Sequence, residues 1–362
     1  SCSINELTQK YYKKFMNDAD ILGISKPDLQ PFATDYVDEM IDYIQTLLKN
    51  NSAYEISGNV LFEVNKFSNY GCLSGRCIEE QDSGARVKIE DYKKNPNDFT
   101  LWKPSLANEP GWESPWGYGR PGWHLECSVM SESVLGVPFD IHGGGNDLKF
   151  PHHDNEIAQT CGFHNSSDPT CFAKYWVHNG FLNLANEKMS KSLGNVVYID
   201  DLLKEFKGNE IRLALLSTHY RQPIPWSLNL LKQAASVARK ISRFTSSHTT
   251  KSKFFPGSNI GKAILDDLNT PKALAIMQSL ITNPKKFDIN QEISTFRYIF
   301  EGSKQDLSLS KEDQDKINQL IKLRLKAREN GDYQTADKIR DELNKMNVSI
   351  KDKNGKTEWE IL

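Results

Sequence analysis

A chain of 362 residues with 45 basic and 47 acidic side chains is too long for one domain of ordinary size and carries a net charge of only −2. Domains mostly run about 100–200 residues, so two or three are expected. Because the charges balance, any contact with nucleic acid must come from a local basic patch. No run approaches the roughly 18 apolar residues needed to cross a bilayer, and the first residues lack a basic-then-apolar leader. These features predict a soluble cytoplasmic protein without a membrane partner.

Six cysteines in a chain of this length do not form a disulfide framework, so reduced thiols are expected. Cys72 and Cys77 lie five residues apart, which is not the two-residue spacing of a zinc knuckle.

The first part of the chain predicts helices followed by short strands. Residues 5–19 have a helical pattern, and Thr34 is predicted to cap an amphipathic helix that runs to Leu48. Residues 53–105 change character, with short β-rich runs between Gly, Ser, Asn and Asp clusters. This segment is predicted to be a small antiparallel insertion.

A glycine triplet follows the strand predicted over residues 137–141. Glycines 143–145 stand where a nucleotide could approach the backbone closely, and Asp147 stands where a ribose hydroxyl could be held. A glycine triplet alone is a weak signal of adenosine binding.

Three residues have the chemistry of a metal site. His152 and Glu156 are four apart just after Pro151, a residue favoured at the first helical position, so both should leave one helix face. A thiolate from Cys127 would complete a set that suits zinc better than calcium or magnesium. The alternative is a capped surface helix beside a buried thiol.

The sequence Lys-Met-Ser-Lys-Ser at 188–192 is the most specific motif of the chain. The ammonium groups of Lys188 and Lys191, on a mobile loop, could neutralise charge that builds on a pyrophosphate group. Without the neighbouring motifs, the same run of Lys and Ser would be interpreted as a solvated loop.

Helical patterns continue from residue 200, with a loop at 245–258 and an N-cap at Asn269 or Thr270. A helix pair follows over 314–346, broken at 330–332, and then strand, turn and strand over 348–359. Basic residues and Tyr333 near the break could hold phosphates and stack an unpaired RNA base, although a solvated helical hairpin has the same composition.

Four patches, at 122–127, 142–147, 151–156 and 188–192, have the order and spacing found in the cysteinyl-tRNA synthetases, which are class I aminoacyl-tRNA synthetases, and the chain resembles this family over nearly its whole length. The resemblance implies an α/β fold: the second half of a Rossmann-like catalytic domain with a β-rich insertion, then an all-α helical bundle and a small C-terminal α+β anticodon-binding domain. The implied parts are the end of the first half of the catalytic fold (1–52), the connective insertion (53–113), the second half of the catalytic fold (114–187), the lysine loop and stem-contact region (188–228), the helical bundle (229–306) and the anticodon-binding domain (307–362).

The resemblance also implies roles for individual residues. Zinc held by Cys127, His152 and Glu156 would select the cysteine thiolate, and Trp123 and His142 would line the cysteine pocket. Lys191 would have the main catalytic role and Lys188 a supporting one. The remaining implied contacts are those to ATP with Mg²⁺, from Gly143, Gly144, Gly145, Asp147, Ser190 and Ser192, and those to the tRNA(Cys) anticodon, from Arg328, Tyr333 and Asp337.

The chain departs from the family pattern in three places. No His-x-Gly-His motif occurs, the fourth zinc-binding cysteine of the family has no counterpart, and Tyr333 stands where members often have tryptophan. We therefore expect this chain alone, a predicted monomer, to be inactive in joining L-cysteine to tRNA(Cys) with ATP. Alternative hypotheses are a tRNA-independent ligase of cysteine and an amino sugar, a non-catalytic tRNA-binding fragment and, more remotely, a metallohydrolase that would leave the lysine loop unexplained.

Overall fold

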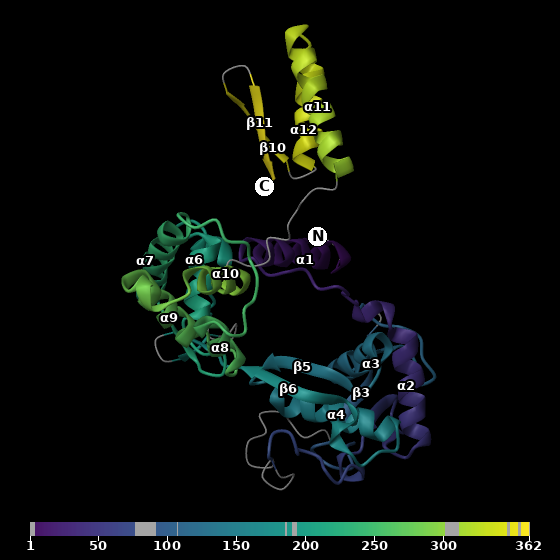
Figure 1. Ribbon diagram of the computed structural model, residues 1–362. Helices are drawn as coiled ribbons and strands as arrows, with labels where there is room; N and C mark the ends of the chain where they lie inside the picture. Colours follow the sequence, from purple (N-terminus) through teal and green to yellow (C-terminus); the bar gives the residue numbers. More distant parts are fainter. Residues whose placement is uncertain are drawn as a thin grey trace.

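A computed structural model describes residues 4–76, 92–106, 108–184, 187–189, 194–300, 311–345, 348–353 and 356–361. The chain forms an α/β unit, a helical bundle and a small C-terminal unit of two helices and two strands (Figure 1). None of the described helices is both long and apolar enough to cross a membrane.

The predicted insertion contributes three strands to an antiparallel sheet, as its pattern predicted, and the fourth strand, β4, lies beyond its predicted end. The sheet has the order β1-β2-β3-β4. Its strands are β1 (Ala53–Ile56), β2 (Asn59–Phe62), β3 (Phe99–Pro104) and β4 (Gly119–Pro121). Ser57 and Gly58, between the first two strands, have φ of 50° and 75°, the left-handed backbone that a tight hairpin turn requires.

Three helices pack with this sheet around one hydrophobic core. They are α2 (Val37–Lys49), α3 (Trp123–Leu135) and α4 (Asp154–Phe163). Ile44, Phe62, Trp102 and Leu125 are fully buried in this core. The predicted insertion therefore shares its core with the helices before and after it.

The predicted cap at Thr34 is wrong. Residues 33–35 form a 3₁₀ turn, and α2 begins only at Val37, with Tyr36 in the cap position. The turn pairs its own backbone, since Asp35 and Tyr36 donate to the carbonyls of Phe32 and Ala33. A turn closed by its own backbone bonds leaves Thr34 away from the end of α2.

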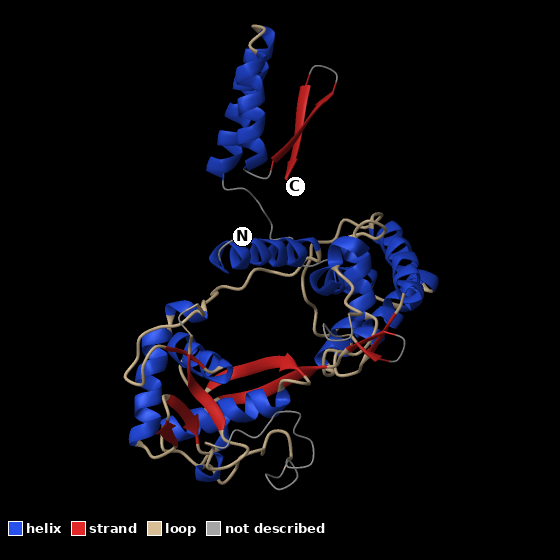
Figure 2. Ribbon diagram, turned by 180° about the vertical axis from the view of Figure 1, so that it is seen from behind, coloured by secondary structure: helices blue, strands red, loops and turns tan. Residues whose placement is uncertain are grey.

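A parallel strand pair forms the centre of the α/β unit (Figure 2). Strands β5 (Phe139–Gly145) and β6 (Ala173–Asn179) run in register from Phe139 opposite Ala173 to Gly145 opposite Asn179, with α4 in the connection between them. The glycine triplet was predicted to follow the strand, but it forms the last three residues of β5 and pairs with β6. The β-α-β unit agrees with the predicted α/β class.

A second core belongs to the helical bundle. Its helices are α5 (Ile199–Leu202), α6 (Gly208–Leu216), α7 (Leu228–Thr245), α8 (Asn259–Leu265), α9 (Thr270–Thr282) and α10 (Ile289–Phe300). Asn269, one of the two predicted cap residues, caps α9, because its side-chain oxygen accepts a hydrogen bond from the backbone N–H of Lys272 at 3.1 Å. Leu22, at the end of α1 (Ile4–Ile21), is buried in the same core.

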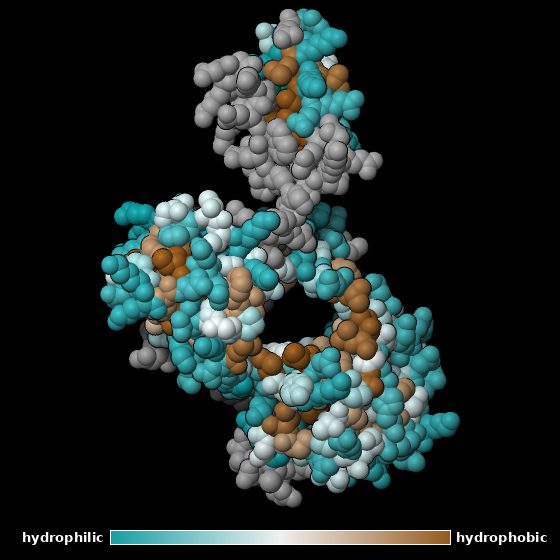
Figure 3. All heavy atoms as spheres, viewed as in Figure 1, coloured by the Kyte–Doolittle hydropathy of each residue, from teal (hydrophilic) through white to brown (hydrophobic). Residues whose placement is uncertain are grey.

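A small sheet lies beside the bundle, with β7 (Leu182–Leu184) between β8 (Glu187–Lys188) and β9 (Ile224–Trp226). Figure 3 shows an opening between the α/β unit and the bundle, and hydrophobic side chains gather on its rim.

The C-terminal unit confirms the predicted helix pair and strand hairpin. Helices α11 (Lys311–Glu329) and α12 (Tyr333–Lys345) are separated at Gly331, whose φ is 76°. Strands β10 (Val348–Lys353) and β11 (Lys356–Ile361) pair antiparallel.

Candidate metal and nucleotide site

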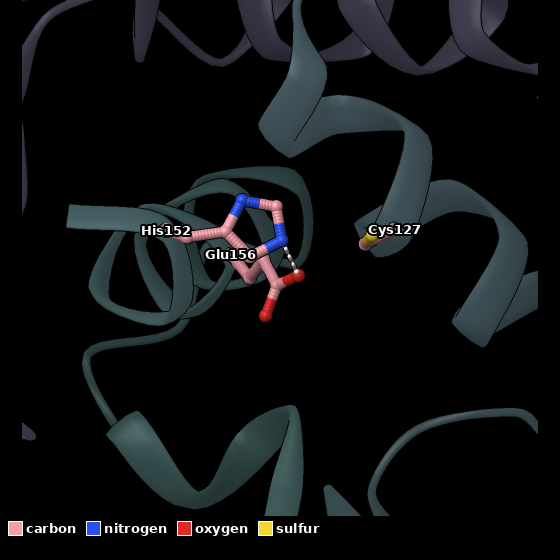
Figure 4. Close-up of side chains that lie close together, drawn as sticks. All are labelled: Cys127, His152 and Glu156. Atoms are coloured by element: carbon pink, nitrogen blue, oxygen red, sulfur yellow. Dashed lines mark ion pairs between the residues drawn. The ribbon is translucent and has the colours of Figure 1, made fainter. Parts of the chain in front are cut away.

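Cys127, His152 and Glu156 lie together, as the spacing predicted. Their ligand atoms are all within 4.8 Å of one another. Figure 4 shows His152 and Glu156 side by side, with Cys127 facing them from α3. Pro151 is, as predicted, the first residue with helical backbone after the extended Phe150 (φ −139°, ψ 135°), and it leads through His152 and His153 into α4 at Asp154.

The Glu156 carboxylate is the centre of the group and is fully buried. Its Oε2 lies 2.9 Å from His142 Nε2, on β5, and its Oε1 lies 2.9 Å from His152 Nε2. Burial acts to raise the pKa of Glu156, but the neighbouring imidazoles of His142 and His152 outweigh it and lower the pKa to about 2. The carboxylate is therefore ionised at neutral pH.

The geometry at Glu156 fits a metal ligand. Oε1 is buried and has no aligned hydrogen-bond partner, although His152 Nε2 is close to it. Two ligand atoms that face a common point without a hydrogen bond are suited to share a cation there. Burial, together with the charge of Glu156, raises the pKa of the Cys127 thiol to about 12. The thiol is therefore protonated at neutral pH, and a metal bound here would have to displace its proton.

Three hydrogen bonds, two of them buried, hold the helices that carry these ligands. The hydroxyl of Ser128 on α3 donates to Oε1 of Gln159 on α4 at 2.6 Å. The start of α4 is held by the insertion, because the Tyr70 hydroxyl donates to Asn155 Oδ1 at 2.5 Å and Leu73 N–H donates to Asp154 Oδ1 at 3.1 Å.

Three further histidines, for which no role was predicted, lie around the three candidate ligands. His124 Nδ1 lies 2.7 Å from His152 Nδ1, and His153 Nδ1 lies 2.8 Å from His178 Nε2. Burial lowers the pKa of His124 and of His153 to about 4, so both are neutral at pH 7. His142, His153 and Glu156 form a second possible ligand group that shares the carboxylate. In the sequence, His124 and His153 are each adjacent to a residue with a predicted role, Trp123 and His152, and this adjacency could have identified them.

The two residues predicted to line the amino-acid pocket both contact the group. Trp123 is 57% exposed, and its ring centroid lies 4.3 Å from that of His152. His142 Nε2 lies 2.9 Å from Oε2 of Glu156, and the centroid of its ring lies 4.8 Å from that of Trp176. Both side chains therefore border the three candidate ligands.

The glycine triplet has a packing role that differs along its length. A Cβ on Gly143 would meet only the Val177 carbonyl oxygen, at 3.6 Å, whereas one on Gly144 would lie 2.9 Å from Cε1 of the buried His153. A Cβ on Gly145 would lie 2.5 Å from the carboxylate of Asp147, an exposed residue. Of the three glycines, only Gly144 must lack a side chain because a histidine of the site, His153, lies against it.

The lysine motif is described only at its first two residues. Lys188 ends β8 opposite Asn183, and Met189 N–H donates to the Leu182 carbonyl at 2.8 Å. Ser190, Lys191 and Ser192 lie outside the described residues.

The residues predicted to contact the anticodon lie on the C-terminal helix pair. Tyr333, the first residue of α12, is 66% exposed. Arg328, near the end of α11, and Asp337, on α12, are also exposed.

Two family models match the chain. Residues 1–236 match the catalytic domain of "tRNA synthetases class I (C)", and residues 312–359 match the "Cysteinyl-tRNA ligase anticodon binding domain". The cysteine–tRNA ligase of Pelagibacter ubique is 43% identical over 99% of this chain and 80% of its own length. That of Maricaulis maris is 41% identical over 99% of this chain and 81% of its own length.

Solved structures with a similar fold are much less similar in sequence. Methionyl-tRNA synthetase of Mycobacterium tuberculosis with methionyl-adenylate superposes with a TM-score of 0.52 at 13% identity, over 82% of this chain and 76% of that one. A putative arginyl-tRNA synthetase of Campylobacter jejuni gives 0.50 at 12% identity, over 81% and 65%. These similarities concern the fold alone.

We expect the two neighbouring substitutions Gly143→Ala and Gly144→Ala to differ in stability. Gly144→Ala should lower the free energy of unfolding by about 1–3 kcal/mol, because a methyl group would crowd His153 in a closely packed site. Gly143→Ala is the matched control and should change it by less than about 0.5 kcal/mol, as most uncrowded substitutions do. Urea unfolding followed by tryptophan fluorescence measures both. Equal losses in the two variants would contradict the packing role of Gly144.

Proposed function

We propose roles for individual residues in this chain, which belongs to the cysteine–tRNA ligase family of class I aminoacyl-tRNA synthetases. Enzymes of this family use ATP to activate cysteine and transfer it to tRNA. The observation that supports the proposal most strongly is the convergence of Cys127, His152 and Glu156 on one point.

Cys127, His152 and Glu156 hold a zinc ion in this proposal. Thiolate, imidazole and carboxylate are typical zinc ligands, and three protein ligands leave a position open. When bound, zinc supplies a bond to the substrate thiolate that serine and alanine cannot form. A pocket of apolar contacts alone would distinguish such small groups by only about 1–3 kcal/mol.

The protein side chains around this point orient the amino acid. Trp123 presents an exposed ring next to His152, and His142 holds one oxygen of Glu156. By keeping the Glu156 carboxylate ionised and in place, His142 would hold this zinc ligand in a position that lets the substrate thiol bind the same ion. Trp123 would cover the bound cysteine side chain.

ATP binds, in this proposal, beyond the end of the parallel strands. Ligands of open parallel sheets bind outside the carboxyl ends of the strands, and β5 and β6 both end at the paired residues Gly145 and Asn179. Gly143, Gly144 and Gly145 would let adenosine approach the backbone, and Asp147 would hold a ribose hydroxyl. Ser190 and Ser192 would contact the phosphates, which carry Mg²⁺.

Lys191 and Lys188 would stabilise the charge that develops on pyrophosphate as the cysteine carboxylate attacks the α-phosphate. This assignment is supported by the sequence motif. The terminal ribose hydroxyl of the tRNA then takes the cysteinyl group from the adenylate, and AMP leaves.

The C-terminal unit would read the anticodon of tRNA(Cys) through Arg328, Tyr333 and Asp337, with the protein acting as a monomer. The exposure of Tyr333 at the start of α12 leaves its ring available for stacking. A ligase that does not use tRNA would have no need for this unit, and the match of residues 312–359 to an anticodon-binding domain favours the tRNA-dependent reaction.

Removing the thiol ligand should weaken zinc binding. In Cys127→Ser, zinc affinity should fall by more than the roughly 10–100-fold that loss of an outer hydrogen-bond partner costs, because a metal–ligand bond is lost. Cys171→Ser is the matched control and should retain wild-type affinity. Competition with a chromophoric chelator measures both. Similar affinity in wild type and Cys127→Ser would rule out the proposed ligand set.

Removing the second lysine of the motif should affect the chemical step alone. In a preparation that shows cysteine-dependent ATP–pyrophosphate exchange, Lys191→Ala should lower the exchange rate by about 100-fold or more, as loss of a group that stabilises transition-state charge does. Zinc content, measured in the same samples, should not change. Exchange at the wild-type rate would exclude the proposed role of Lys191.

Removing the exposed ring of Tyr333 should weaken tRNA binding. If a base stacks on this ring, Tyr333→Ala should cost about 1–3 kcal/mol, whereas Tyr298→Ala, at an exposed tyrosine on α10, should bind like wild type. Arg328→Ala should weaken binding by an amount that shrinks with added salt, since a phosphate contact releases counterions. Filter binding of tRNA(Cys) across a salt series measures all three. Wild-type affinity in Tyr333→Ala would contradict the stacking role.

A further inference from the structure

Two cysteines lie close together outside the candidate metal site. Cys161 is on the last turns of α4, and Cys171 ends a short 3₁₀ turn (Pro169–Cys171) that leads into β6. Their Sγ atoms are 3.1 Å apart. Neither thiol has a role in the function proposed above.

The two thiols differ in access and in charge. Cys161 is only 1% exposed, and its Sγ also lies 3.3 Å from the carbonyl oxygen of Asp168. Cys171 is partly exposed. The contact with the Cys161 thiol lowers the pKa of Cys171, and the same contact together with burial raises the pKa of Cys161. Cys171 is thus the thiol that becomes a thiolate first and that solvent can reach.

We propose that Cys161 and Cys171 are an oxidation site, a dithiol that forms a reversible disulfide with low-molecular-weight disulfides. The residues already stand at the separation from which a small movement closes the bond. Transient disulfides of this kind occur in reducing compartments, where stable ones are rare.

The reaction takes two exchange steps. The Cys171 thiolate attacks one sulfur of a disulfide RSSR, forms a mixed disulfide and expels RS⁻, which takes up a proton. Cys161 then loses its proton and attacks Sγ of Cys171, which expels the second RS⁻. In sum, two protein thiols become one disulfide, and RSSR becomes two RSH, with two electrons transferred.

The bond would join α4, which carries Glu156, to the turn before β6, the strand that carries His178. Glu156 lies five residues before Cys161 on α4, and His178 lies seven residues after Cys171 on β6. The disulfide would therefore tie the helix that carries Glu156 to the turn that leads into β6. This places a covalent, reversible constraint next to the metal site without using any of its ligands.

The sequence allows a direct test. No Lys or Arg lies between Phe150 and Lys174, so trypsin releases one peptide, residues 150–174, that contains both cysteines. After incubation with oxidised glutathione and blocking of free thiols, this peptide should be two hydrogens lighter than its reduced form and should carry no blocking group. Treatment with a reducing agent should restore two free thiols.

Two single variants and one control separate the steps. Cys161→Ser should accumulate a glutathione adduct on Cys171, whereas Cys171→Ser should leave the buried Cys161 largely unmodified. Cys127→Ser should form the bond at the wild-type rate, so the outcome is independent of zinc binding. A wild-type peptide that stays reduced or carries only glutathione adducts would overturn the proposal. So would a cross-link from this peptide to residues 67–76, which contain Cys72.

Discussion

The site depends on the pairing of the buried Glu156 carboxylate with two imidazoles. A charge with no exposure to water is costly unless it is paired, and each of its oxygens faces an imidazole at 2.9 Å. His142 comes from β5, and His152 precedes α4. The need to satisfy one anion therefore fixes the strand and the helix of the β-α-β unit relative to each other.

The rest of the α/β unit keeps that arrangement rigid. The insertion contributes the hydrogen bonds that hold Asp154 and Asn155, and Ser128 connects α3 to α4 in the protein interior. A ligand group with three different side chains requires such support, because small displacements of the helices would move the ligand atoms apart. The common core of sheet and helices serves the same end.

The sequence predicted what depends on local periodicity. The four-residue spacing of His152 and Glu156, the buried stripe of α2 and the cap at Asn269 follow from helical geometry within a few residues. The class of fold followed from the family resemblance that the order of the motifs supports. Backbone details could not be foreseen where a tertiary contact or a neighbouring turn competes with local preference, as at Thr34 and the glycine triplet.

Two contacts between segments distant in sequence were not predicted. His153 and His178 are 25 residues apart and meet because β5 and β6 are parallel neighbours. Cys161 and Cys171 are close because the chain turns back between α4 and β6. Neither pair has a recognisable spacing. Such pairs are set by how the connection between parallel strands packs, which the residues of one segment do not reveal.

The charges of the candidate ligands and of the neighbouring histidines explain why this group of residues suits a cation. Without a metal, Glu156 carries one negative charge, His124 and His153 are neutral, and Cys127 keeps its proton because burial and the nearby carboxylate raise its pKa to about 12. The same carboxylate that opposes ionisation of Cys127 favours a cation at the point that both face. Occupancy by a divalent ion would therefore exchange the thiol proton for a metal bond, so the affinity of the site should rise with pH in the neutral range.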